Sequence, residues 1–338
     1  MLPRRIPTTT RADWQSELRD AITSAPELLQ FLELSAGEVG FSEEACADFP
    51  LKVPRVFAAR MTKGDPRDPL LLQVMASGRE LLAAPGYGPD PVGESGAANP
   101  APGIIHKYRG RALLIATGAC AIHCRYCFRR HFPYDVQQNS RREWREALGY
   151  VARDPEISEV ILSGGDPLVL TDRHLRELVA MIAAIPHVRR LRIHTRLPVV
   201  IPERVTRGLL DAILHHRLQT VMVIHSNHPK EIDAAVQTAA AALRQRGITL
   251  LNQAVLLGGI NDDADALVAL SERLFATGIL PYYLHLLDRV QGAAHFDVAE
   301  QRARQLLADL SARLPGYLVP KLVREVAGAA SKQSVPPL

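Results

Sequence analysis

The feature that most limits how this chain can fold is a regular alternation of short apolar runs with longer amphipathic segments. Six runs rich in β-branched and apolar residues occur from residue 112 onward, and after the first gap their starts lie about thirty residues apart. A strand, a crossover helix and two short loops need roughly thirty residues, so the strands should be parallel. The runs cover residues 112–116, 159–162, 191–195, 220–224, 249–254 and 280–284; the amphipathic segments include 173–184, 202–215, 231–246 and 264–276.

The number of units separates the possible α/β architectures. Six units are too few for a closed eight-stranded barrel. A partial (β/α)6 barrel fits the repeat better than a doubly wound sheet, although both have the same period. We predict a barrel core over residues 104–290, a mainly helical extension and linker over 1–103, and a C-terminal helix, strand and tail over 291–338. Residues 86–103, rich in Gly, Pro, Ala and Asp, should form a loop.

Composition removes several classes of function. Among 338 residues, 40 basic and 36 acidic side chains give a formal net charge of +4, and the arginines are spread along the chain. That excess is too small to indicate a nucleic-acid partner. No apolar stretch approaches the roughly 18 residues that a membrane span needs. The two arginines near the N-terminus have no apolar run behind them, so we expect no signal peptide and a soluble, cytoplasmic protein without a membrane partner.

Polar residues lie at the end of each predicted strand or directly after it. Because the carboxyl ends of parallel strands meet at one edge of a sheet or barrel, these residues should lie together and form a site. They are Cys120, the Gly164–Pro167 turn, Thr195 with Arg196, the His225–His228 segment, Gln253 and Asp288.

Three of the four cysteines lie in one short loop with the spacing C-x-x-x-C-x-x-C, at Cys120, Cys124 and Cys127. Clustered thiols in a cytosolic chain usually hold metal, and thiolates bind iron and zinc well. Three thiolates would leave one iron of a 4Fe–4S cluster open to chelate S-adenosylmethionine. The alternative is structural zinc with His123 or His131 as the fourth ligand, although no second cysteine pair exists.

The remaining cysteine, Cys46, stands alone in an acidic segment and is more consistent with a small buried apolar residue.

This loop, placed after a first strand, resembles the radical S-adenosylmethionine superfamily. The resemblance implies a partial barrel of six βα units, in agreement with the repeat. It also implies that the turn after the second strand binds S-adenosylmethionine through Ser163, Gly164, Gly165 and Asp166, with His225 and Gln253 as further residues of that pocket.

From about residue 106 to the C-terminus the chain more narrowly resembles the lysine 2,3-aminomutase family. The stretches that carry the resemblance are Cys127–Phe132, Arg196–Val200, Asn252–Leu257 and Gly316–Pro320. The family is a group of isomerases in which a deoxyadenosyl radical removes hydrogen from lysine bound to pyridoxal phosphate, and the amino group moves from the α- to the β-carbon. The resemblance therefore implies a 4Fe–4S cluster, S-adenosylmethionine, pyridoxal 5'-phosphate, an external electron donor and the substrate L-lysine.

Roles for individual residues follow from the same resemblance. Lys332, in a small-residue tail, matches the lysine that binds pyridoxal phosphate covalently, and Arg111 matches the arginine that binds its phosphate. Arg129 matches the arginine that grips the substrate carboxylate, as a planar guanidinium can. Asp288 and Glu325 match acids that bind the side-chain ammonium, which must not be buried unpaired.

Two departures point to one branch of this family. Catabolic relatives carry a cysteine-rich tail and a Gly-x-Asn-Asp-Cys segment that bind zinc between subunits, whereas this chain reads Asp263 at that cysteine and has no cysteine after Cys127. Together with the His131–Tyr134 segment, this resembles the branch that makes (R)-β-lysine for elongation factor P and its β-lysyl ligase. The alternatives are a mutase making free β-amino acids from lysine or glutamate and, from another class, a zinc-stabilised binding protein of the translation apparatus.

Overall fold

The repeat folds into one sheet whose nine strands are ordered as they occur in the chain. In the computed structural model, which describes residues 13–134 and 141–338, strands β2 to β8 are parallel, whereas β1 and β9 pair antiparallel at the two ends. The strands are β1 (Ile104–Tyr108), β2 (Arg111–Thr117), β3 (Glu159–Gly164), β4 (Arg190–Thr195), β5 (Gln219–His225), β6 (Thr249–Val255), β7 (Leu280–His285), β8 (Lys321–Arg324) and β9 (Gln333–Ser334). All six predicted strands are present, so the α/β partial barrel is confirmed.

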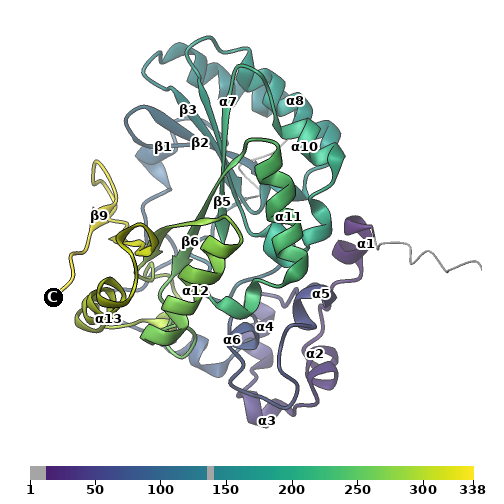
Figure 1. Ribbon diagram of the computed structural model, residues 1–338, viewed down its shortest axis with the longest axis vertical. Coiled ribbons are helices and arrows are strands. Elements are labelled where there is room, and N and C mark those ends of the chain that lie inside the picture. Colours follow the sequence, from purple (N-terminus) through teal and green to yellow (C-terminus); the bar gives the residue numbers. More distant parts are fainter. Residues whose placement is uncertain (1–12, 135–140) are drawn as a thin grey trace, which may run out of the picture.

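Helices follow the parallel strands and lie along the outside of the sheet (Figure 1). They are α7 (Arg141–Arg153), α8 (Asp172–Ala183), α9 (Leu197–Val200), α10 (Arg207–Ile213), α11 (Ala234–Gln245), α12 (Ala264–Ala276) and α13 (Glu300–Arg313). The helix predicted over residues 202–215 is wrong at its start. Pro202–Arg204 forms a separate 3-10 turn. The helix α10 begins at Arg207, and Thr206 caps it because its hydroxyl accepts a hydrogen bond from the Leu209 amide.

The two faces of the sheet have different chemistry because side chains alternate along a strand. One set, including Leu114, Leu162, Leu191 and Ile193, is buried in the main apolar core. The alternate positions line a cavity, and several of them are polar: Arg111, Ser163, Arg192, His194, Gln253, Tyr283 and His285. The concave face of the partial barrel is therefore built to hold polar ligands.

The N-terminal extension is helical, and its short helices gather at one end of the molecule beside the barrel (Figure 1). They are α1 (Trp14–Arg19), α2 (Ala25–Leu32), α3 (Ala36–Val39), α4 (Glu43–Asp48), α5 (Arg55–Ala58) and α6 (Pro69–Leu72). Further 3-10 turns are Gly78–Leu81, Gly96–Ala98, Pro167–Val169, Pro229–Glu231, Ala294–Phe296 and Gly316–Leu318. One cluster of buried apolar residues includes both this extension and the barrel. The division at residues 103 and 290 stays a prediction.

No helix among the described residues combines the length and the apolar character needed to cross a membrane.

Candidate active site

One cavity of about 520 Å³ on the concave face brings the expected site residues together. They come from distant parts of the chain, including loops after four strands and the C-terminal tail. The lining includes Cys120, Cys124, Cys127, Ser163, Gly164, Gly165, Asp166, His225, Gln253, Arg111, Arg129, Asp288, Glu325 and Lys332. Every residue that the sequence analysis assigned to a cofactor or substrate thus faces the same space.

The cysteine loop is held in place by the N-terminal extension. Arg125, inside the loop, is fully buried and pairs with Glu80 at 2.6 Å. Its guanidinium also donates to the main-chain oxygens of Ala45 and Phe49. The Lys52 ammonium donates to the Cys120 carbonyl at 2.8 Å. Removing one partner of a buried ion pair costs about 3–5 kcal/mol, so the extension fixes the loop firmly.

The three thiols form a donor set that needs a positive ligand. Burial, and then the neighbouring thiols, raise the pKa of Cys120 well above its usual value and that of Cys127 to about 11. A cation such as the iron of a cluster would favour the ionised form of Cys120 and Cys127. Arg196 supplies one positive contact, because its Nη1 donates to the Cys124 sulfur at 2.7 Å. The donor set therefore fits an iron–sulfur cluster.

A single zinc ion fits less well. Within residues 13–134 and 141–338, no three His, Cys, Asp or Glu side chains are placed to hold one metal ion. One ring nitrogen of each proposed fourth ligand contacts a main-chain carbonyl: His123 Nδ1 that of Pro50 at 2.8 Å, and His131 Nε2 that of Gln291 at 3.2 Å. In a cubic cluster each thiolate binds its own iron, so the sulfurs need not converge on one point.

The turn after β3 packs directly against the start of the cysteine loop. Gly164 has φ +115°, and a Cβ there would lie 2.4 Å from the Thr117 carbonyl oxygen. A Cβ on Gly165 would lie 2.3 Å from the Ala119 carbonyl oxygen. Both glycines are therefore required by this close approach, whatever ligand they also bind.

Asp166 joins the ends of two strands. Its carboxylate accepts hydrogen bonds from the Thr195 hydroxyl and the Arg196 amide, both at 2.7 Å, and from the amides of Leu168 and Leu197. Burial raises the pKa of Asp166, and these four donors oppose that rise. The side chain thus holds the loops after β3 and β4 together, and its contact with S-adenosylmethionine stays a prediction.

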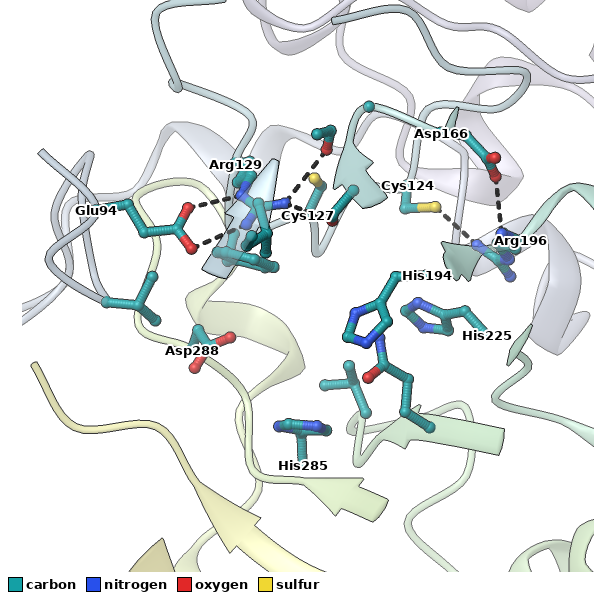
Figure 2. A pocket seen from close by; sticks show the side chains of 18 of the residues that line it. Glu94, Cys124, Cys127, Arg129, Asp166, His194, Arg196, His225, His285 and Asp288 are labelled. Atoms are coloured by element: carbon teal, nitrogen blue, oxygen red, sulfur yellow. Dashed lines mark hydrogen bonds and ion pairs between the residues drawn. The ribbon is translucent and has the colours of Figure 1, made fainter. Parts of the chain in front are cut away.

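Three histidines face the cavity from β4, β5 and β7 (Figure 2). His225 Nε2 lies 3.2 Å from the Asn227 Oδ1 atom, and burial lowers the pKa of this imidazole to about 4. Burial also lowers the pKa of His194 and of His285 well below the usual value. The Nε2 atoms of His194 and His285 are buried and have no hydrogen-bond partner in the part of the chain that the structure describes. Neutral rings with free nitrogens in a cavity fit a bound polar ligand.

The C-terminal tail delivers Lys332 to the same cavity. Antiparallel pairing of β8 with β9 closes a loop that places the Lys332 ammonium 2.5 Å from the Glu325 carboxylate. Lys107 also pairs with Glu325 at 2.5 Å, and the Tyr108 hydroxyl donates to it at 2.8 Å. Burial alone would raise the pKa of Glu325, but Lys332 and Lys107 hold it well below the usual range. A lysine amine inside a polar cavity fits an aldehyde cofactor.

Arg111 lies at the amino-terminal start of β2, away from the strand ends that carry the cysteine loop. Its guanidinium lies over the Tyr108 ring at 4.7 Å. Arg192 and Tyr283 also line the cavity, and both Arg111 and Arg192 are near enough to Tyr283 to offset part of the rise in its pKa that burial causes. The cavity therefore extends along the concave face, and a fixed cation at this end fits a phosphate group.

Asp288 follows β7 and is the acid with the most strongly raised pKa. Burial raises its pKa to about 7, although Lys332 and Lys107 lower it in part. Asp288 is only partly buried by its exposure, and an added cation beside it would stabilise the ionised carboxylate.

Arg129 is buried and bonded on two sides. Its Nε and Nη2 atoms donate to the Glu94 carboxylate at 2.6 and 2.9 Å, while Nη1 donates to the Ser163 hydroxyl at 3.0 Å (Figure 2). Glu94 belongs to the loop over residues 86–103, and the sequence analysis did not single it out. Glu94 belongs to no sequence motif, and the same is true of the inward-facing Lys107, His194 and His285. For the two histidines, the period-two alternation of side chains along β4 and β7 was a usable signal.

Comparison with known proteins identifies the family. Residues 114–270 match the family model described as the Radical SAM superfamily. The L-lysine 2,3-aminomutase of Escherichia coli K12 is 49% identical over 96% of this chain and 95% of that protein. The Haemophilus influenzae protein of the same name is also 49% identical, over 98% of both chains. The one from Clostridium subterminale is 31% identical over 96% of this chain and 78% of its own length.

The fold and the match from residue 114 to 270 define a radical S-adenosylmethionine enzyme. Within that class, the chain belongs to the L-lysine 2,3-aminomutase family. It is therefore an isomerase, and its cofactors are a 4Fe–4S cluster, S-adenosylmethionine and pyridoxal phosphate.

Proposed function

We propose that this enzyme converts L-α-lysine to (R)-β-lysine and that the product serves β-lysylation of elongation factor P by its ligase. The observation that carries the reaction is the shared cavity, in which three thiols, a lysine amine, a buried arginine and two acids face one space. The relatives named L-lysine 2,3-aminomutase support the same substrate.

In this proposal the residues divide into three groups. Cys120, Cys124 and Cys127 bind three irons of the cluster. S-adenosylmethionine binds against the turn after β3 and the residues near the ends of β5 and β6. Pyridoxal phosphate binds covalently to Lys332, and its phosphate lies near Arg111. The residues proposed for S-adenosylmethionine are Ser163, Gly164, Gly165, Asp166, His225 and Gln253. When bound, these groups supply hydrogen-atom abstraction and an electron-delocalising ring that lets an amino group migrate.

The protein's own contribution is to bind, orient and enclose the substrate. Arg129 takes the α-carboxylate, and its existing hydrogen bonds fix the guanidinium before the substrate arrives. Asp288 and Glu325 take the side-chain ammonium. Holding the reacting carbon in one place and excluding water are what such a cavity contributes to a radical reaction. An external electron donor completes the system.

Lysine fits these acids better than glutamate does. Both amino acids have the same α-amino acid head, so Arg129 does not distinguish them. Asp288 and Glu325 attract an ammonium and repel a carboxylate. Losing one charge-assisted contact of this kind costs about 2–5 kcal/mol, or roughly thirtyfold or more in lysine use. Free β-amino acid production from glutamate is therefore the weaker alternative.

The link to elongation factor P is supported by two short segments. Asp263 stands where catabolic relatives carry the zinc-binding cysteine, and here its carboxylate accepts a hydrogen bond from the Ala266 amide at the start of α12. That position caps a helix. The segment His131–Tyr134 resembles the elongation factor P branch.

Anaerobic incubation of the reconstituted enzyme with lysine or glutamate, S-adenosylmethionine and a reductant tests the reaction. We expect (R)-β-lysine by chiral chromatography and little product from glutamate. Adding elongation factor P and its ligase should give protein from which acid hydrolysis releases β-lysine, identified by chromatography because the two isomers have the same mass. Turnover of glutamate alone would contradict the substrate, and (S)-β-lysine would contradict the stereochemistry. If the ligase uses α-lysine equally well in direct competition with β-lysine, the link to elongation factor P fails while the mutase activity stands.

The pKa of Asp288 predicts how lysine binding depends on pH. In the unliganded cavity this carboxyl is protonated below about pH 7, whereas an ammonium binds the carboxylate form. Lysine affinity should therefore be highest above pH 7 and fall as the pH drops below it, approaching tenfold per unit. Binding at pH 7 should release part of a proton, measurable by calorimetry in buffers of different ionisation enthalpy. Asp288→Asn should lose both the proton release and the pH dependence; their persistence would remove Asp288 from the ammonium site.

A further inference from the structure

The acid that contacts Arg129 comes from outside the βα repeat. Glu94 is buried, and both of its carboxylate oxygens accept from the guanidinium, Oε2 from Nε and Oε1 from Nη2. A two-pronged contact of this kind fixes the plane of an arginine as well as its charge. Lys107 lies 3.6 Å from the same carboxylate, so Glu94 is held between two cations.

The loop that carries Glu94 is tied down on both sides. We call residues 86–99 the strap. Near its start, Gly88 exchanges main-chain hydrogen bonds with Arg289 and Gln291, directly after Asp288. Asp90 accepts from the amides of Glu94 and Ser95, both at 2.9 Å.

The strap also packs against the tail that delivers Lys332. Gly93 has φ +63°, and a Cβ added there would lie 3.0 Å from the Cβ of Ala327. Glu94 is thus presented to Arg129 by a segment anchored beside both Asp288 and the tail.

Counting donors shows that Glu94 does not block Arg129. A guanidinium has five N–H groups. Glu94 takes the one on Nε and one of the two on Nη2, and Nη1 donates to Ser163 at 3.0 Å and to the Gly164 carbonyl at 3.3 Å. The second Nη2 donor has no hydrogen bond to any of the described residues, and Arg129 lines the cavity. A substrate carboxylate can therefore bind at that end while Glu94 stays in place.

We propose that Glu94 is a positioning residue, which holds the Arg129 guanidinium in the orientation that selects substrates with a free α-carboxylate. This inference rests on the proposed function, in which Arg129 binds that carboxylate. Glu94 itself does not contact the substrate. Its role is to keep the remaining donor of Arg129 aimed into the cavity, so its loss should weaken recognition of the carboxylate more than recognition of the rest of the molecule.

The test compares lysine with lysinamide, which has the same side chain and amino groups but no carboxylate. Binding is measured on the enzyme loaded with the cluster and pyridoxal phosphate, without S-adenosylmethionine or reductant, from the change in the visible absorbance of the pyridoxal group. In Glu94→Gln one prong is lost, because an amide N–H faces the guanidinium. The ratio of the lysinamide Kd to the lysine Kd should fall about tenfold or more, mainly through weaker lysine binding.

Asp48→Asn is the matched control. Asp48 is an exposed acid paired with the neighbouring Arg130, which keeps a second partner in Glu80. This variant makes the same chemical change beside the next arginine in the sequence, and its ratio should equal that of the parent.

Each outcome separates the two proposals. If Glu94→Gln leaves the ratio unchanged while Arg129→Gln lowers it, the positioning role is wrong and carboxylate binding by Arg129 stands. If Arg129→Gln also leaves the ratio unchanged, the proposed function is wrong at that residue. Tighter lysine binding by Glu94→Gln would mean that Glu94 competes with the substrate, which also overturns the proposal. Should Glu94→Gln fail to fold, Glu94→Asp decides in the same way, because its side chain is one methylene shorter and its carboxylate is drawn back from the guanidinium.

Discussion

Replacing Cys120, Cys124 or Cys127 with alanine should abolish assembly of the 4Fe–4S cluster and cleavage of S-adenosylmethionine. Each thiol would be the sole protein ligand of one iron, and the fourth iron has to stay open, so the loop has no spare ligand. Iron and sulfide content, the electron paramagnetic resonance of the reduced enzyme and deoxyadenosine release measure the effect.

Cys46→Ala is the control for this series. Cys46 is half-buried in α4 and packs against the apolar core, so its thiol acts as a small hydrophobic group. Its loss should leave the cluster and deoxyadenosine release intact. A loop variant that keeps a full, reducible cluster would defeat the assignment of that cysteine, and loss of the cluster in Cys46→Ala would extend the ligand set beyond the loop.

The order and spacing of the strands could be predicted from the sequence because they depend on local periodicity. The run at residues 191–195 became β4, and Glu159, the first residue of the preceding run, opens β3. The thirty-residue period fixes a parallel order with one helix between neighbours, so strand position, sheet order and the edge that carries the cysteine loop follow together. The antiparallel strands β1 and β9 lie outside that repeat and were not predicted.

The contacts that hold the site together were not predictable in the same way. Arg125 sits inside the cysteine motif, yet its partner Glu80 is 45 residues away in a segment without periodicity. Glu94 lies in a loop rich in glycine and proline, 35 residues from Arg129. Ion pairs of this kind depend on how the extension folds back over the barrel. Motifs identified which side chains matter, whereas their partners required the three-dimensional structure.

Glu325 shows how the structure changes the interpretation of a single residue. The resemblance implied that it binds the substrate ammonium, and the structure pairs it with the ammonium groups of Lys332 and Lys107. These statements are compatible if the substrate takes the position of Lys332 beside Glu325. Asp288, which has no ion pair of its own among the described residues, is then free to pair with the substrate ammonium and contributes more to recognition than Glu325. For this reason we expect Glu325→Gln to affect lysine turnover less than Asp288→Asn does.

Lys332→Ala should lose the covalent bond to pyridoxal phosphate and at least about a hundredfold of mutase activity, while the cluster still assembles. Only an amine at this position can bond to the cofactor aldehyde, and losing that bond also loses the cofactor's orientation. Glu325 keeps Lys107 and Tyr108 as partners, so the fold around the tail should persist. Lys332→Arg is the matched control for charge: it preserves an ion pair with Glu325 but forms no such bond, so it should be as inactive as Lys332→Ala. Borohydride reduction followed by peptide mapping would locate the modified lysine, and iron content would report the cluster. Labelling of another lysine would show that Lys332 does not bind the cofactor. Full activity in Lys332→Arg would show that this residue supplies the interaction with Glu325 rather than the bond to the cofactor.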